Sequence, residues 1–205
     1  MKRILRNKYR IVFPPLVFLA AALLLLTVPV RWLLAALCSG FVHELCHVLV
    51  IRFFGLKIHS VHIGINGARI KTEPMTCIQE LFCALAGPLG ALSLLFFAKW
   101  IPRVAICAAF QSLYNLFPVY PSDGGRILYC CAKLLLPDSS AIGVSQVVGA
   151  VFLFCAVAIG IYGTFFLHLG LVPILIAWSL VFRSIRNKNS LQTGPSQGTI
   201  VVSQK

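Results

Sequence analysis

Charged residues are scarce in this sequence, and acidic residues are the scarcest. The 205 residues include 18 Lys and Arg but only 5 Asp and Glu, and 59% of all residues are hydrophobic. With a mean hydropathy of +0.91, such a chain would precipitate as a soluble domain. The composition therefore predicts a protein whose solvent is lipid.

Closely spaced cysteine pairs are also missing, which argues against a zinc finger or a disulfide framework. Eight cysteines are present, but none forms a CxxC pair. Five of them lie within apolar runs, where cysteine usually packs as a small core residue: Cys38, Cys46, Cys83, Cys107 and Cys155. We expect reduced thiols.

What the sequence has in abundance is apolar runs long enough to cross a bilayer as helices. They cover residues 11–30, 32–51, 81–98, 104–122 and 139–182. The last run is long enough for two crossings, hinged near Gly160 and Gly163. The runs predict an all-α fold, a multi-pass transmembrane helix bundle of about six crossings over residues 1–186. The polar tail, residues 187–205, is predicted to be disordered and cytoplasmic.

The positive charge is explained by membrane topology. A net charge of +13 on a soluble protein would suggest nucleic acid. With a cytoplasmic N-terminus and six crossings, however, only Arg31, Lys99 and Arg103 lie on the far side, and the other 15 basic residues face the cytoplasm. We therefore expect both termini in the cytoplasm and no nucleic-acid partner.

Residues 52–75 contain basic residues and alternating apolar positions, and they are predicted to form a small cytoplasmic β-hairpin. Its turn is expected at Asn66-Gly67, the strongest short hairpin pattern. The predicted pairs are Ile65 with Ala68, Ile63 with Ile70, and His62 with Lys71. Two roles stay open: a loop packed on the membrane surface, or a strand edge that takes up an extended peptide.

The segment His43-Glu44-Leu45-Cys46-His47 has the HExxH spacing. On a helix, residues four apart share one face, so both imidazoles can bind one zinc ion. Glu44 points away from that pair and can deprotonate a zinc-bound water. The alternative is that both histidines are hydrogen-bonded packing residues and Glu44 is a buried, protonated acid. Because ionisable groups within a membrane are costly, the functional interpretation is favoured.

A catalytic zinc usually has three protein ligands, and Asp123 is the best third candidate. It follows a segment broken by Pro118 and Pro121 and precedes two glycines, Gly124 and Gly125, which permit close backbone approach. Irregular backbone at membrane depth is tolerated where it lines a cavity. The alternative for Asp123 is an ordinary helix N-cap.

Three motifs in order resemble the site-2 protease family of intramembrane zinc metalloproteases. They are HELCH, then Ala86-Gly87-Pro88, then the Asn115, Pro118, Pro121, Asp123, Gly124 pattern, and together they cover residues 42–126. The short chain with an early HExxH is similar to the subgroup that contains the stage IV sporulation protein FB. At two points the sequence departs from that pattern. Ala91 stands where the family often has Asn, and no CBS domain follows, which puts nucleotide regulation in doubt.

The resemblance implies one zinc ion per chain, with His43, His47 and Asp123 as ligands and Glu44 as general base. Asn115 would contact substrate or stabilise the oxyanion, with Pro118 and Pro121 in the same substrate-binding segment. The structural positions at the site would be Gly87, Pro88, Gly124 and Gly125.

The resemblance also implies the reaction, hydrolysis of a peptide bond within or next to a transmembrane segment. The expected partners are a membrane-associated protein substrate, such as a sigma-factor precursor or another regulatory protein, the lipid bilayer, and regulatory membrane proteins. The expected location is the bacterial plasma membrane. Two alternatives belong to other classes: a metal or ion transporter, and a non-proteolytic membrane scaffold.

Overall fold

The computed structural model describes residues 28–64, 67–168 and 170–186, and within them the chain is mostly helical. Its helices are α2 (Val30–Phe53), α3 (Cys77–Leu92), the 3-10 helix η1 (Ser93–Phe97), α4 (Pro102–Asn115), α5 (Asp123–Leu135), α6 (Asp138–Phe165) and α7 (Val172–Arg186). Two short strands, β1 (Ile58–Gly64) and β2 (Gly67–Thr72), lie between α2 and α3.

Three stretches of the described chain are long and apolar enough to cross a membrane: Val30–Phe53, Cys77–Phe97 and Asp138–Phe165. The other predicted crossings correspond to shorter helices or to residues that the structure does not describe. In the predicted fourth run, α4 ends at Asn115, and the apolar part of α7 covers only Val172–Phe182. Most of the first predicted run and the whole 187–205 tail lie outside the described residues. The count of about six crossings therefore stays a prediction.

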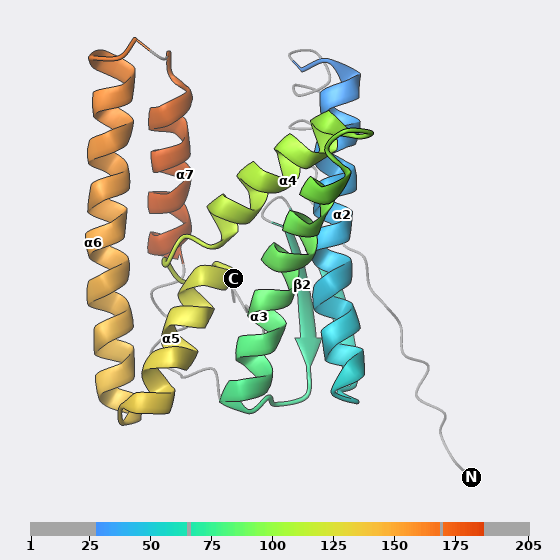
Figure 1. The fold of residues 1–205 in the computed structure, drawn as a ribbon. Coiled ribbons are helices and arrows are strands. Elements are labelled where there is room, and N and C mark those ends of the chain that lie inside the picture. The colour runs from blue at the N-terminus through green and yellow to red at the C-terminus, as the bar shows by residue number, and fades with distance from the viewer. Residues whose placement is uncertain (1–27, 65–66, 169, 187–205) are drawn as a thin grey trace.

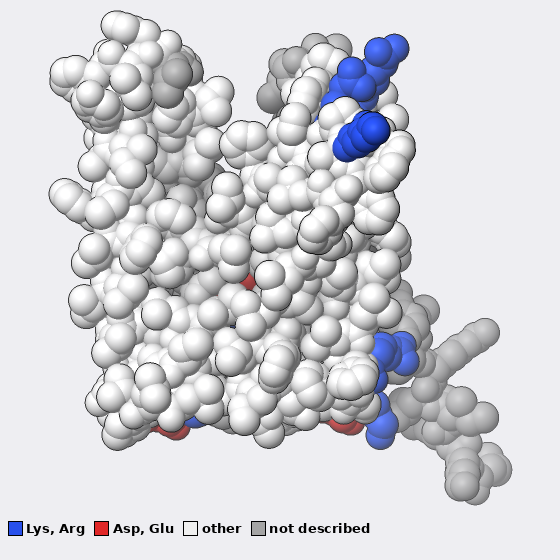
Figure 2. Space-filling view, viewed as in Figure 1, with Lys and Arg blue, Asp and Glu red and all other residues white. Residues whose placement is uncertain are grey.

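The surface is that of a membrane protein. Large apolar side chains point outward from the helices, among them Phe41, Phe96 and Phe154, which are 68%, 85% and 75% exposed. Lys and Arg gather at the two ends of the molecule and leave a nearly uncharged band between them (Figure 2). Such a band is what a hydrocarbon layer requires of the side chains that face it.

The helices form two groups joined by α5. Helices α2, α3 and α4 pack together on one side, and α6 and α7 form an antiparallel pair on the other (Figure 1). Helix α5 packs against both α3 and α6. A hydrogen bond of 3.0 Å between the hydroxyls of Tyr114 and Ser179 also ties α4 to α7.

The run 139–182 divides into two helices, but the break follows Phe165 and does not lie at Gly160 or Gly163, near which it was expected. Helix α6 continues through both glycines to Phe165, and the turn to α7 follows. A Cβ placed on Gly160 would lie 2.9 Å from the Cβ of Ala177 in α7. The missing side chain lets two helices approach closely, a common use of glycine in membrane helices.

Strands β1 and β2 pair antiparallel, but not in the predicted register. Gly64 lies opposite Gly67, and Ile63 lies opposite Ala68, where the pattern had placed Ile65. His62 lies opposite Arg69, two residues away from its predicted partner Lys71. A shift of two residues leaves every side chain on its original face, so the apolar pattern cannot distinguish the two registers.

Candidate metal centre

Helix α2 places both histidines on its inward face. Its buried residues recur every fourth position: Ala35, Ser39, His43, His47 and Ile51. This spacing keeps them along one side of a helix, while the other sides carry the apolar residues that face lipid. The two imidazoles are therefore one turn apart and directed into the protein rather than into the membrane.

The turn between α4 and α5 brings in Asp123. Helix α5 begins at Asp123, and Ser122 is its N-cap, with Oγ accepting a hydrogen bond of 3.4 Å from the Gly125 N–H. Asp123 is therefore not the N-cap, and that alternative is wrong. A Cβ on Gly124 would overlap the Leu116 carbonyl oxygen, and one on Gly125 would overlap the Tyr120 backbone nitrogen. The glycines allow the preceding loop to fold back onto the start of α5.

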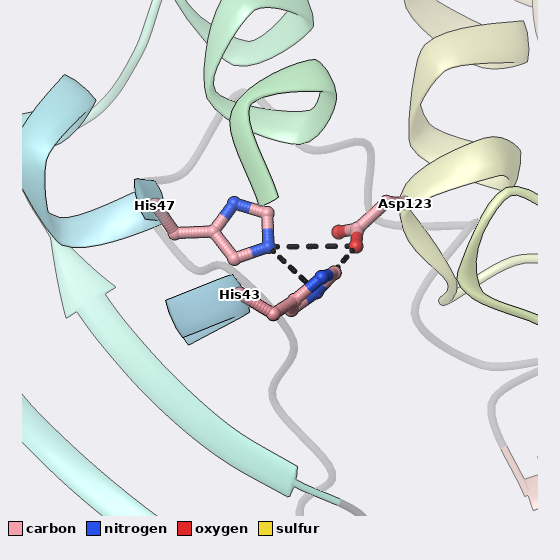
Figure 3. Close-up of side chains that lie close together, drawn as sticks. All are labelled: His43, His47 and Asp123. Atoms are coloured by element: carbon pink, nitrogen blue, oxygen red, sulfur yellow. Dashed lines mark hydrogen bonds and ion pairs between the residues drawn. The ribbon is translucent and has the colours of Figure 1, made fainter. Parts of the chain in front are cut away.

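Three side-chain atoms converge at this point (Figure 3). Oδ2 of Asp123 lies 3.1 Å from Nε2 of His43 and 3.4 Å from Nε2 of His47, and the two nitrogens are 3.2 Å apart. All three residues are buried. In a tetrahedral zinc site with bonds of about 2.0–2.1 Å, ligand atoms lie roughly 3.3–3.4 Å from one another. The spacing of the three atoms fits such an ion.

The hydrogen bonding of His47 supports the same conclusion. Its Nδ1 lies 2.7 Å from the backbone carbonyl oxygen of Cys83 in α3. A carbonyl can only accept, so Nδ1 carries the proton, and in the neutral ring Nε2 presents a lone pair. That lone pair faces a carboxylate oxygen, and two acceptors that face each other require a cation or a proton between them. An arrangement of this kind orients a histidine for metal binding.

Helix α3 can approach the histidines because position 87 has no side chain. A Cβ on Gly87 would overlap Nε2 of His47 and would lie 2.9 Å from Cε1 of His43. The next residue, Pro88, is buried, and its carbonyl accepts a hydrogen bond of 3.1 Å from the Ser112 hydroxyl in α4. The Ala86-Gly87-Pro88 segment is thus where three helices come together around the site.

The remaining predicted residues lie at or near this group. Glu44 follows His43 on α2 and is half-buried. Asn115 ends α4, and its Nδ2 lies 3.4 Å from Nε2 of His43. Pro118 and Pro121 lie in the loop that connects Asn115 to Asp123, so they shape the segment between the two site residues.

Two residues at the site were not singled out from the sequence. Arg126 is only 4% exposed, and its Nε lies 3.2 Å from Oε1 of Glu80, while its Nη1 lies 3.6 Å from Oδ1 of Asp123. The only sequence signal for Glu80 and Arg126 is that each is a charged residue within an apolar stretch. The Cys83 carbonyl has no sequence pattern at all, because every residue carries one.

Comparisons with known proteins found similar sequences and a similar fold. Stage IV sporulation protein FB of Bacillus subtilis is 30% identical in an alignment 143 residues long, which covers 62% of this chain and 49% of that protein. The site-2 protease from Methanocaldococcus jannaschii superposes with a TM-score of 0.60, at 19% identity over 83% of both chains. The chain is thus similar to a sporulation protein in sequence and to a site-2 protease in fold.

A further relative is the "Putative zinc metalloprotease sll0528" of Synechocystis, which is 29% identical in an alignment 162 residues long that covers 70% of this chain and 41% of that one. No family model matches the sequence. The chain spans about half the length of the curated relatives it matches. The sequence similarity therefore covers less than half of each of these two relatives.

Proposed function

We propose that this chain is an intramembrane zinc metalloprotease that hydrolyses a peptide bond within or next to a transmembrane segment of a membrane-associated protein. The observation that carries the proposal is the buried group of His43, His47 and Asp123, whose ligand atoms lie within 4.8 Å of one another in a membrane protein. An ionisable group at such depth is costly, and a metal site with a catalytic role accounts for that cost.

His43, His47 and Asp123 would hold one zinc ion. When bound, zinc acts as a Lewis acid that polarises the scissile carbonyl and makes a water molecule acidic enough to attack at neutral pH. Glu44 takes the proton from the attacking water and delivers it to the leaving amine nitrogen. The position of Glu44, directly after a ligand but off the ligand face, suits a base that acts beside the metal.

Asn115 serves the same reaction from α4. Its amide nitrogen lies 3.4 Å from Nε2 of His43, close enough to reach the carbonyl oxygen of a peptide at the metal. An N–H donor in a site shielded from water stabilises the negative charge that develops on that oxygen. The role of Asn115 is therefore to stabilise the oxyanion.

The substrate must be unwound before it can be cut, because a helix hides its carbonyls in internal hydrogen bonds. The irregular segment Asn115–Pro121 and the strand pair β1–β2 are the parts of the chain suited to hold an extended peptide. A free strand edge can bind such a peptide through its backbone, as in strand addition.

The membrane domain comprises residues 1–186 with about six crossings, and residues 187–205 form a polar cytoplasmic tail. Arg31, Lys99 and Arg103 lie at the end of the molecule where α2 begins and α4 begins, which supports placing that end outside the cytoplasm. Both termini then face the cytoplasm of a bacterial cell. The substrate is a sigma-factor precursor or another regulatory protein, a choice that rests on the similarity to a sporulation protein.

The test is cleavage of single-pass membrane proteins by the purified full chain in vesicles. Wild type is compared with Glu44→Gln, which removes the base and leaves the proposed ligands in place. Glu73→Gln is the matched control, because Glu73 is an acid that forms an ion pair of 3.8 Å with Lys57 and does not belong to the group of His43, His47 and Asp123. The cleavage rate of Glu44→Gln should fall by about 10²–10⁴, the usual share of general acid–base catalysis.

Zinc content should be the same in all three proteins, since Glu44 is not a ligand. A chelator should stop cleavage by wild type, and added zinc should restore it. Cleavage by Glu44→Gln at the wild-type rate would sink the mechanism. Activity that survives complete removal of the metal would sink the metalloprotease itself.

A further inference from the structure

The ion pair between Glu80 and Arg126 lies in an unusual place. Arg126 in α5 and Glu80 in α3 are 4% and 8% exposed, and 3.2 Å separates Nε from Oε1. Buried ion pairs are weak contributors to stability, because taking two charges out of water costs about as much as their attraction returns. A role in holding α3 to α5 alone therefore explains this pair poorly.

The pair reaches the proposed metal group through Asp123. Arg126 lies three residues after Asp123, so the two side chains share one face of α5. The two carboxylate oxygens have different neighbours: Oδ2 faces Nε2 of His43 at 3.1 Å and Nε2 of His47 at 3.4 Å, whereas Oδ1 faces Nη1 of Arg126 at 3.6 Å. One oxygen is turned to the histidines, and the other to a guanidinium.

The guanidinium of Arg126 is in turn held by Glu80. Its Nε is held by Glu80, and its rigid planar fork leaves the Nη1 edge directed at Asp123. Neighbours outside the ligand set commonly orient a ligating carboxylate, and here the neighbour is an ion-pair partner at 3.6 Å. Because Glu80 also balances the charge, Arg126 can stand beside a divalent cation with less repulsion.

We propose that Arg126, itself held by Glu80, is a positioning residue that fixes the Asp123 carboxylate so that one oxygen alone is presented to the metal. The inference rests on the proposed zinc site and adds two residues to it. The Cys83 carbonyl in α3 plays the corresponding part for His47 in α2. Helix α3 thus contributes to the orientation of two of the three ligands while supplying none itself.

The sign of the effect on zinc affinity separates positioning from simple electrostatics. Arg126→Gln removes a positive charge near the ion, so repulsion alone predicts tighter zinc binding. Loss of positioning predicts weaker binding, by about 10- to 100-fold for an outer residue of this kind. Arg126→Lys keeps the charge but loses the planar fork, so electrostatics predicts no change and positioning predicts a smaller weakening.

The measurement is zinc affinity of the purified full chain by competition with a chromophoric chelator, with thermal unfolding of the zinc-free proteins as the folding check. Lys133→Gln is the matched control, because Lys133 is also on α5 and in an ion pair of 3.2 Å, but with Asp138. Its zinc affinity should equal that of wild type. Should Arg126→Gln fail to fold, Arg126→Lys carries the test.

Glu80→Gln completes the design. If Glu80 acts through Arg126, the double variant Glu80→Gln with Arg126→Gln should bind zinc no more weakly than Arg126→Gln alone. Folded Arg126 variants that bind zinc as tightly as wild type, or more tightly, overturn the inference while leaving the zinc site in place. A wild-type protein that binds no zinc overturns the proposed function as well.

Discussion

Replacing Gly87 with Ala tests the packing of α3 against the metal group. The new Cβ would overlap Nε2 of His47, lie 2.5 Å from Cε1 of the same ring, and lie 2.9 Å from Cε1 of His43. Ordinary contact begins at about 3.4 Å, so the His47 ring must retreat by about 1 Å. Metal–ligand distances tolerate about 0.2 Å, so this shift breaks the bond.

A minimum for the loss of zinc affinity can be estimated. Removing a residue that only orients a ligand costs about 10–100-fold in metal affinity, so displacing the ligand itself should cost at least 100-fold. That corresponds to about 2.7 kcal/mol of zinc binding free energy. Helix propensity acts the other way, since Ala is more favourable than Gly inside a helix by roughly 0.5–1 kcal/mol. Any loss must therefore come from the contact with the histidines.

The assay is zinc affinity of the purified protein together with the cleavage rate and the thermal unfolding midpoint. Gly143→Ala is the matched control, because a Cβ at Gly143 in α6 meets nothing within 4 Å. This variant should match wild type in zinc affinity. If Gly87→Ala bound zinc within about threefold of wild type, the steric reasoning for this position would be wrong.

Two further changes probe the same site. Asp123→Asn keeps the shape of the side chain but removes its charge, so zinc content per chain, measured by atomic emission, should fall well below one while Asp138→Asn leaves it unchanged. A full zinc complement in Asp123→Asn would remove Asp123 from the ligand set. Replacing Asn66-Gly67 with Ala-Ala should slow cleavage of transmembrane substrates while zinc content stays at one per chain, because only the proposed strand pair is disturbed. Unchanged cleavage of every substrate would exclude the strand pair from substrate binding.

The grouping of His43, His47 and Asp123 can be predicted from the sequence because the HExxH spacing is local and the choice of acidic residues is small. His43 and His47 are four apart in a strongly helical run, and only four acids other than Glu44 exist in the whole chain. Asp123 is separated from them by about 80 residues, yet the prolines Pro118 and Pro121 mark the segment just before it as irregular backbone within an apolar run. The structure brings all three together within a few ångströms.

Run length predicts helices less well. The uncharged run 104–122 suggested one crossing, but α4 stops at Asn115, three residues before Pro118. Proline disfavours helical conformation in the residue before it, so the helix ends short of the run. An uncharged run shows which residues lipid tolerates, but it does not determine where a helix ends.

Contacts between helices that are distant in the sequence could not be predicted from it. Glu80 and Arg126 are 46 residues apart, and only the packing of α3 on α5 makes them partners. Gly160 looked like a hinge because glycine has that use too, whereas its place against Ala177 shows a packing role. In each case one residue type serves several purposes, and only its neighbours decide between them.

The hydrogen bond from His47 to the Cys83 carbonyl has a consequence for genetics. Because the acceptor is a main-chain atom, substitution of the Cys83 side chain leaves it in place, and position 83 can vary without loss of this contact. A mutational scan would therefore detect the packing of the Cys83 side chain, which is 1% exposed, and not the contact that its carbonyl makes with a proposed metal ligand. Removing that contact takes a change to the backbone itself, such as replacing the amide with an ester, whose carbonyl is a weaker acceptor.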